Sequence, residues 1–458
     1  MNKRWFLALA MLAPLATAPA GAARPAPKAA LPRVPRVNFT DTRLKNGLRV
    51  LLARDASAPV ISVAVVYNVG AFVEPVGHTG FAHLFEHLMF EGSANLAKGE
   101  HAKLLTDNGG TYNGGTSFDF TIYYETLPSN QLALGLFLEA DRMGGLDVTQ
   151  RNLDNQRAVV QEERRMRYDN VPYGTLSERL QDLAFTKSPY KHMPIGSMAD
   201  LNAASLAYVR HFYRTFYAPD NAVLVVSGDF DPARAAALVS KYFARIPRGP
   251  KPTFPSLYEP PQTKERRLAY TDPLASLPAY ISGYHIPNGN HPDAPALEML
   301  GSVLTGGKSA RVWKSLVEVK QVCTSVSAGG GAGRGPDLFT FRMTFAPGQK
   351  VETAEAALDA EIARVRQSGV TADEMRTARV QALLGAVQSR RDSMMRAEEI
   401  GIDAVVYGDP NRANTHLAKL NAVTAADVRR VARKYLVRSN RSVVIALPPV
   451  ANVPEAAQ

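Results

Sequence analysis

The sequence has only one cysteine, Cys323, among 458 residues. A single thiol excludes an intramolecular disulfide, and its distance from the N-terminus excludes a lipid-bearing cysteine at a cleavage site. We expect Cys323 to be a small buried residue rather than a nucleophile. The chain is longer than one hydrophobic core supports, so we expect two or more domains.

Long apolar runs and long blocks of like charge are also missing beyond the N-terminus. No stretch there approaches the roughly 20 apolar residues that cross a bilayer, so we expect no integral membrane segment in the mature chain. The net charge is +11, but basic residues are spread along the chain and mixed with acidic ones. This distribution argues against nucleic acid as a partner.

Acidic residues are absent before Asp41, and the N-terminus has its own pattern. A short basic start is followed by the apolar stretch Trp5 to Leu15 and then by small residues up to Ala22. This order predicts a secretory signal peptide at residues 1–22, and we expect a periplasmic protein. A mitochondrial transit peptide is the alternative, although such peptides are amphipathic rather than continuously apolar.

Two segments rich in proline mark breaks in the chain. The first is a flexible lead-in at 23–36, and the second is a linker that begins at Ile246. The predicted order is signal peptide 1–22, lead-in 23–36, N-terminal domain 37–245, linker 246–253, C-terminal domain 254–450 and tail 451–458.

The two halves carry matching landmarks. Leu201-Asn202-Ala203 opens a helical stretch that precedes an apolar strand at 222–226, and Leu420-Asn421-Ala422 opens another before a strand at 442–446. Such internal similarity predicts a duplication. The expected fold class is α+β, with two duplicated α/β sandwich domains in which helices pack on a mainly antiparallel sheet.

One helix carries the residues for metal chemistry. In His83-Leu84-Phe85-Glu86-His87 the histidines are four residues apart, so on a helix both imidazoles can reach one ion. Zinc suits such ligands, and the Glu86 carboxylate is placed to act as a general base and then as an acid. The corresponding segment of the second half, 296–300, is mainly apolar.

A third ligand has to come from elsewhere in the chain. A predicted helix over 152–167 offers two adjacent carboxylates, Glu162 and Glu163. The spacing along the helix does not separate them, and charged helical residues often face solvent.

The sequence resembles the pitrilysin, insulinase and mitochondrial-processing-peptidase family, whose inverted zinc motif reads His-x-x-Glu-His. The resemblance covers the motif helix, the segment Gly109 to Thr116 and the segment Val159 to Glu163. It implies that Glu163 is the third Zn²⁺ ligand. It also implies that an extended peptide substrate adds as a strand beside Asn113, Gly114 and Thr116.

The chain departs from the family at three positions. Gln156 replaces a carboxylate that lies behind the zinc site in relatives, and Val317 and Thr324 replace an Arg and a Tyr that bind substrate over the metal. Val317 cannot replace the guanidinium group of the Arg, and Thr324 cannot replace the phenol of the Tyr. We therefore expect a heterodimer, in which a homologous partner supplies the Arg and the Tyr.

The predicted function is that of a zinc metalloendopeptidase that hydrolyses oligopeptides or unfolded segments, with His83, His87 and Glu163 as ligands and Glu86 as the catalytic base. The alternative is a non-catalytic structural or substrate-binding subunit. The intact motif favours the enzyme, whereas Gln156 and the missing clamp keep the alternative open.

Overall fold

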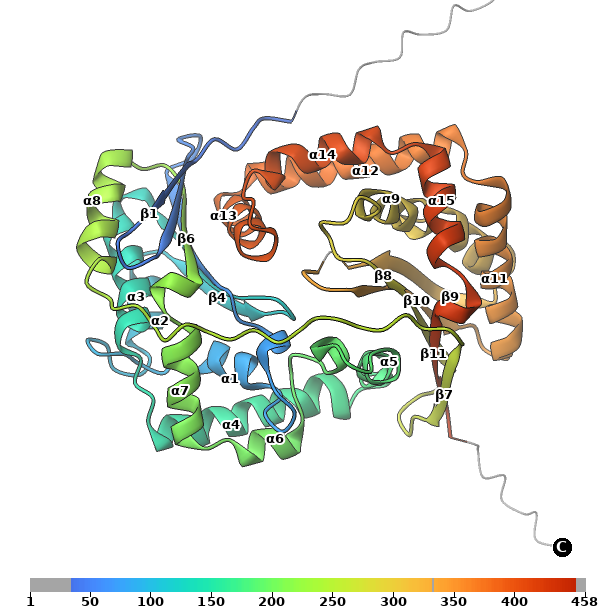
Figure 1. Ribbon diagram of the computed structural model, residues 1–458, viewed down its shortest axis with the longest axis horizontal. Helices are drawn as coiled ribbons and strands as arrows, with labels where there is room; N and C mark the ends of the chain where they lie inside the picture. Colours follow the sequence, from blue (N-terminus) through green and yellow to red (C-terminus); the bar gives the residue numbers. More distant parts are fainter. Residues whose placement is uncertain (1–33, 332, 450–458) are drawn as a thin grey trace, which may run out of the picture. The chain divides into compact units, whose positions relative to one another are not determined.

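A computed structural model describes residues 34–331 and 333–449. It contains two mainly antiparallel sheets with helices packed on them (Figure 1), which confirms the predicted fold class. The signal peptide, most of the lead-in and the C-terminal tail of the prediction lie outside the described residues. No described helix has the length and apolar character of a membrane span.

The first half forms a six-stranded sheet in the order β1-β2-β6-β3-β5-β4, in which only β2 and β6 run parallel. Its strands are β1 (Thr40–Arg43), β2 (Arg49–Arg54), β3 (Val60–Tyr67), β4 (Thr111–Thr116), β5 (Thr121–Pro128) and β6 (Ala222–Gly228). Its helices are η1 (Ala71–Val73), α1 (Phe81–Leu88), α2 (Glu100–Asp107), η2 (Ser129–Gln131), α3 (Leu132–Gly145), α4 (Gln150–Arg164), η3 (Arg165–Asp169), α5 (Leu176–Ala184), η4 (Pro189–Lys191), α6 (Met198–Ala203), α7 (Leu206–Phe216), η5 (Pro219–Asn221) and α8 (Pro232–Phe243).

The second half forms a five-stranded sheet in the order β7-β11-β8-β10-β9, in which only β7 and β11 run parallel. Its strands are β7 (Arg266–Thr271), β8 (Ala279–Ile286), β9 (Cys323–Gly330), β10 (Asp337–Phe345) and β11 (Arg441–Leu447). Its helices are α9 (Ala294–Thr305), α10 (Arg311–Trp313), η6 (Lys314–Val319), α11 (Val351–Ser368), α12 (Ala372–Arg391), α13 (Ser393–Ile402), η7 (Asp403–Tyr407), α14 (Arg412–Ala422), α15 (Ala425–Tyr435) and η8 (Arg438–Asn440).

The two sheets have the same topology. The order β2-β6-β3-β5-β4 corresponds strand by strand to β7-β11-β8-β10-β9, and the single parallel pair falls at the same place in each. In each half one helix, α7 or α15, leads through a short 3₁₀ turn into a buried inner strand of the sheet, β6 or β11. The predicted duplication is therefore confirmed, while the exact domain boundaries around the linker stay a prediction.

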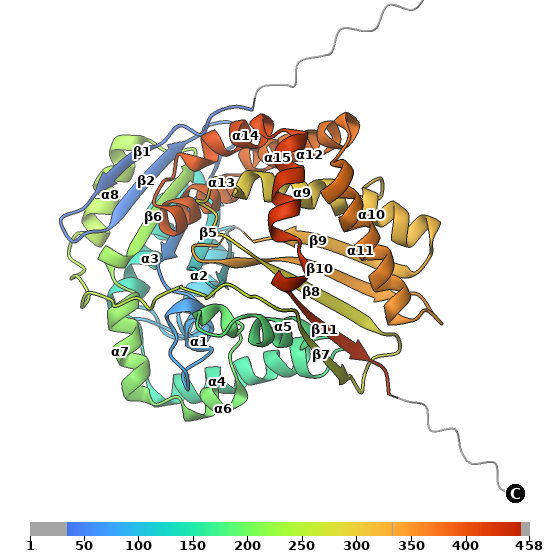
Figure 2. The same cartoon turned by 45° about the vertical axis from the view of Figure 1, so that its right-hand side comes forward.

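The halves exchange one helix. Helix α5 of the first half packs on β11 and β8 of the second sheet, and α13 of the second half packs on β3 and β6 of the first sheet (Figure 2). Apolar residues hold both contacts, since Leu180 of α5 shares a core with Ile281, and Ile400 of α13 shares one with Val225. Each sheet therefore has one face covered by a helix from the other half of the chain.

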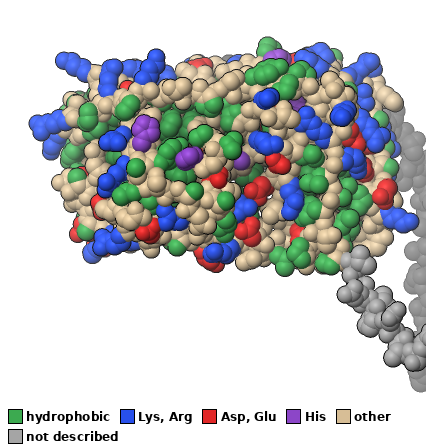
Figure 3. Space-filling model, turned by 60° about the horizontal axis from the view of Figure 1, so that its bottom comes forward, with side chains coloured by type: hydrophobic (Ala, Val, Ile, Leu, Met, Phe, Trp, Pro, Cys, Tyr) green, Lys and Arg blue, Asp and Glu red, His purple; other side chains and the backbone are tan. Residues whose placement is uncertain are grey.

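Charged side chains are mixed on the surface. On the face shown in Figure 3, Lys and Arg side chains alternate with acidic and apolar ones and form no continuous stripe.

Candidate metal and catalytic site

Helix α1 begins at a backbone position that only glycine adopts readily. Gly80 has a φ of 89°, and a Cβ atom there would lie 2.9 Å from the carbonyl oxygen of Ile195. The buried carboxylate of Glu74 accepts the backbone N–H groups of Gly80 at 2.8 Å and Ala82 at 2.7 Å. It also lies 2.9 Å from Nε2 of His192. These contacts satisfy amides that a helix start leaves unpaired, and they hold the motif helix in place.

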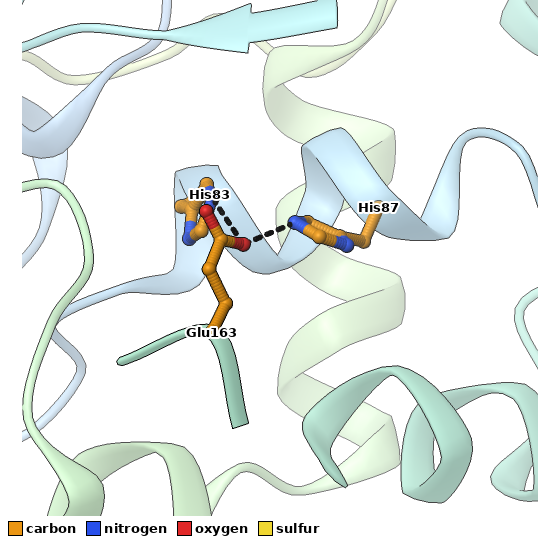
Figure 4. A group of neighbouring side chains, drawn as sticks. All are labelled: His83, His87 and Glu163. Carbon is orange, nitrogen blue, oxygen red and sulfur yellow. Dashed lines mark ion pairs between the residues drawn. The ribbon is translucent and has the colours of Figure 1, made fainter. Parts of the chain in front are cut away.

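The structure brings His83, His87 and Glu163 together (Figure 4). The Oε2 atom of Glu163 lies 3.5 Å from Nε2 of His83 and 3.1 Å from Nε2 of His87. One possible ligand atom from each residue falls within 4.8 Å of the other two. Packing of α4 against α1 produces this arrangement.

The structure also distinguishes Glu162 from Glu163 as the third candidate ligand, which the spacing along the helix could not do. Glu162 points away from the histidines, with its side chain 58% exposed and paired with Arg165. Glu163 is 17% exposed and also contacts Arg167 at 2.7 Å. Of the two, Glu163 is the one placed to bind the ion.

The charge states of these groups fit a divalent cation. Burial, with a smaller contribution from the charge of His87, lowers the pKa of His83 to about 4, so its imidazole is neutral at pH 7. The hydrogen bond from His87 lowers the pKa of Glu163 and keeps it a carboxylate. Two imidazoles and a carboxylate are a ligand set that zinc accepts, with a fourth position left for water or substrate.

Glu86 lies on α1 beside the edge strand β4. Burial raises the pKa of Glu86, and a hydrogen bond from the Thr116 hydroxyl opposes that rise. Gly114 lets the strand approach, because a Cβ atom there would lie 3.2 Å from Cγ of Glu86. Thr116 and Gly114, two of the three predicted substrate-binding residues, therefore line the Glu86 side of β4.

The third residue, Asn113, lies on the other face of the strand, because side chains alternate along it. Its side chain makes a hydrogen bond with the phenol of Tyr124. The outer edge of β4 pairs with no other strand of the described sheet.

Gln156 lies about two turns before Glu163 on α4 and is buried. Its amide donates to Oε1 of Glu91 at 2.7 Å, and Oε2 of Glu91 pairs with Lys98 at 2.6 Å. A carboxylate is thus present next to Gln156, but it comes from the segment after α1. Sequence reasoning missed both Glu91 and Glu74, because each is a lone carboxylate outside any spacing motif.

The residues at the expected clamp positions are not suited to binding a peptide. Val317 of η6 packs, half-buried, against the core of the second half. Thr324 of β9 is exposed, and its hydroxyl donates to the carbonyl oxygen of Thr344 at 3.3 Å. Burial raises the pKa of the neighbouring Cys323 to about 12, so this thiol is inert, as expected.

Comparison with known proteins identifies relatives of both halves. Residues 49–194 match the family model described as insulinase, peptidase family M16, and residues 203–381 match the peptidase M16 inactive domain. The zinc protease PqqE of Helicobacter pylori is 29% identical over 409 residues, which are 89% of this chain and 92% of that protein.

Solved structures agree with this relationship. A protease from Helicobacter pylori superposes with a TM-score of 0.86 at 29% identity, covering 90% of this chain and 100% of that one. The periplasmic protease PqqL of Escherichia coli has a TM-score of 0.73 at 18% identity, covering 91% of this chain and 48% of that one. Together with the duplicated fold and the matched family models, these likenesses show that the chain belongs to the M16 family of peptidases, the family of pitrilysin and insulinase.

Proposed function

We propose that the chain is a zinc-dependent endopeptidase whose metal is held by His83, His87 and Glu163. The observation that carries the proposal is the convergence of these three side chains beside a partly buried Glu86. When bound, zinc polarises the carbonyl of a peptide bond and makes water a better nucleophile.

Glu86 would transfer the proton in this reaction. Its ionised carboxylate accepts a proton from the attacking water and then gives that proton to the leaving amine. The two environments that it faces suit both roles, since burial favours the protonated acid and the Thr116 hydroxyl favours the carboxylate.

The substrate in this proposal is an extended peptide that adds to the free edge of β4. Backbone hydrogen bonds from the strand would hold the peptide regardless of its sequence. Gly114 keeps the strand close to Glu86, and Thr116 orients the carboxylate.

We further propose that a homologous partner subunit completes the site, because Val317 and Thr324 cannot clamp a peptide. The N-terminal pattern supports export to the periplasm, the compartment named for the similar Escherichia coli protease. Co-purification from the native host should recover a partner that has the Arg and Tyr and lacks the zinc motif.

The test of the chemistry combines metal analysis with peptide cleavage. The purified chain should contain about one zinc per molecule, and it should cleave unfolded peptides either alone or with its partner. Glu86→Gln should keep the zinc and lose cleavage by at least about 100-fold. Cleavage unaffected by Glu86→Gln would refute the mechanism, and zinc without cleavage in any combination would favour a non-catalytic subunit.

A further inference from the structure

Helix α13 lies along β3 on the face of the first sheet opposite to α1. At its start, the Ser393 hydroxyl lies 2.8 Å from that of Ser62, which in turn lies 2.7 Å from the hydroxyl of Thr126. Towards its end, Gly401 approaches Val66 so closely that a Cβ atom would lie 2.8 Å from the valine Cγ2. These two contacts fix the direction of the helix over the sheet.

The rotation of α13 about its axis is also fixed. Nε of Arg396 lies 3.3 Å from the hydroxyl of Ser227 on β6, so Arg396 is on the β6 side. Strands β6 and β5 flank β3 on opposite sides, and β4 lies beyond β5. Because successive helical residues turn by about 100°, Glu398 lies on the far side of α13 from Arg396, towards β5 and β4.

Tyr124 of β5 links Glu398 to the edge strand. Burial raises the pKa of Tyr124 most, and the negative charge of Glu398 raises it further. The side chain of Asn113 forms a hydrogen bond with the same phenol. Glu398, Tyr124 and Asn113 therefore border β4 on the face that points away from Glu86.

The charge of Glu398 is not neutralised within the described part of the chain. Arg390 pairs with Glu399 at 2.9 Å, and Arg396 pairs with Asp55 at 2.9 Å. No Lys, Arg or His of residues 34–331 and 333–449 forms an ion pair with Glu398. A half-buried carboxylate loses part of its hydration, and without a neighbouring cation no ion pair compensates for that loss. A cationic ligand would therefore bind there favourably.

We propose that Glu398, with Tyr124 and Asn113, forms a subsite that selects a Lys or Arg side chain of the peptide substrate. This inference rests on the proposed function, in which the peptide adds as a strand to β4. Side chains of an added strand point alternately to the two faces of the sheet. The residue in this subsite is therefore adjacent in sequence to one that faces Glu86, which places the basic residue close to the cleaved bond.

Binding to the full-length Glu86→Gln variant loaded with zinc tests the subsite without turnover. The probes are fluorescent peptides of one neutral sequence, with Lys, Gln or Glu placed at each position in turn. At one position, Lys should bind about tenfold more tightly than Gln, as expected for one partly buried ion pair. Adding Glu398→Gln should remove the preference, and Glu398→Lys should shift it to a Glu-containing peptide.

Glu399→Gln is the matched control, because it removes the same charge from the adjacent residue, whose carboxylate is bound by Arg390. The Lys preference should survive in this variant. Equal binding of Lys and Gln peptides at every position, a preference that persists in Glu398→Gln, or no peptide binding either alone or with the co-purified partner would overturn the proposal. Cleavage assays with native Glu86 are a separate measurement, so a charge preference without cleavage would refute the proposed function and leave the subsite.

Discussion

The two halves of the chain share a sheet topology, and they differ in the helix that comes after strand β3 in the first half and after strand β8 in the second. In α1 the buried face includes His83 next to Glu86 and His87, whereas the corresponding helix α9 buries apolar residues such as Leu297 and Leu300. Both helices pack on the same kind of sheet. A few side chains on a shared scaffold therefore create the candidate metal site in one half and not in the other.

The largest effect on zinc binding and peptide cleavage should come from Glu163, which reaches the two histidines of α1 from helix α4. Glu163→Gln should release zinc and reduce peptide cleavage by more than about 100-fold, because two histidines alone hold zinc weakly. Glu162→Gln is the control and should change neither, since that side chain points to solvent. Zinc content and kcat/KM measure both. If the two variants lost zinc equally, the arrangement of α4 against α1 would be wrong.

The next prediction concerns the end of the exchanged helix α13. Burial, opposed by the charge of Arg412, raises the pKa of Asp403 to about 7. The folded state therefore holds a proton that the unfolded state releases near pH 4, and stability falls as the pH rises between these values. Asp403→Asn should gain stability over the parent by up to about 1.4 kcal/mol per pH unit across this range.

Urea unfolding at pH 4.5, 6 and 7.5 would measure the gain. Asp182→Asn on α5, where the side chain is 70% exposed, should keep the pH dependence of the parent. A gain in Asp403→Asn that did not grow with pH would show that Asp403 is already ionised in the fold.

The smallest effect compares two helical glycines of the second half. Gly401 of α13 has no room for a methyl group, because a Cβ atom would lie 2.8 Å from Val66 and 3.0 Å from Val225 of the first sheet. Gly401→Ala should therefore lower the free energy of unfolding by up to about 2 kcal/mol. Gly385→Ala on α12, where a Cβ atom meets nothing within 4 Å, should raise it by about 1 kcal/mol. Equal stabilisation by both substitutions would mean that α13 does not pack tightly on the first half.

The motif residues could be predicted because their chemistry is local. His83 and His87 are one helical turn apart, and this spacing alone places both imidazoles on one side of a helix. The choice between Glu162 and Glu163 required the angle at which α4 crosses α1, which is a tertiary contact. The family resemblance supplied that choice, and the geometry agrees with it.

Other features depend on contacts between distant segments and have no local signal. Glu74 caps α1 from the preceding loop, and Glu91 meets Gln156 across 65 positions of sequence. The duplication was visible as repeated helix and strand patterns, but the exchange of α5 and α13 was not. An amphipathic helix shows that it packs on a sheet without showing which sheet.

The exchange of α5 and α13 resembles the arrangement in a domain-swapped dimer whose two copies have been joined into one polypeptide. In such a dimer each copy is incomplete, because the helix that covers its sheet belongs to its neighbour. Severing the chain at the linker would leave two fragments, each with an apolar sheet face uncovered and an apolar helix unburied. Burial of those apolar surfaces would drive the fragments to reassociate. The covalent linker is therefore needed less for holding the two halves together than for ensuring that each N-terminal half pairs with a C-terminal half.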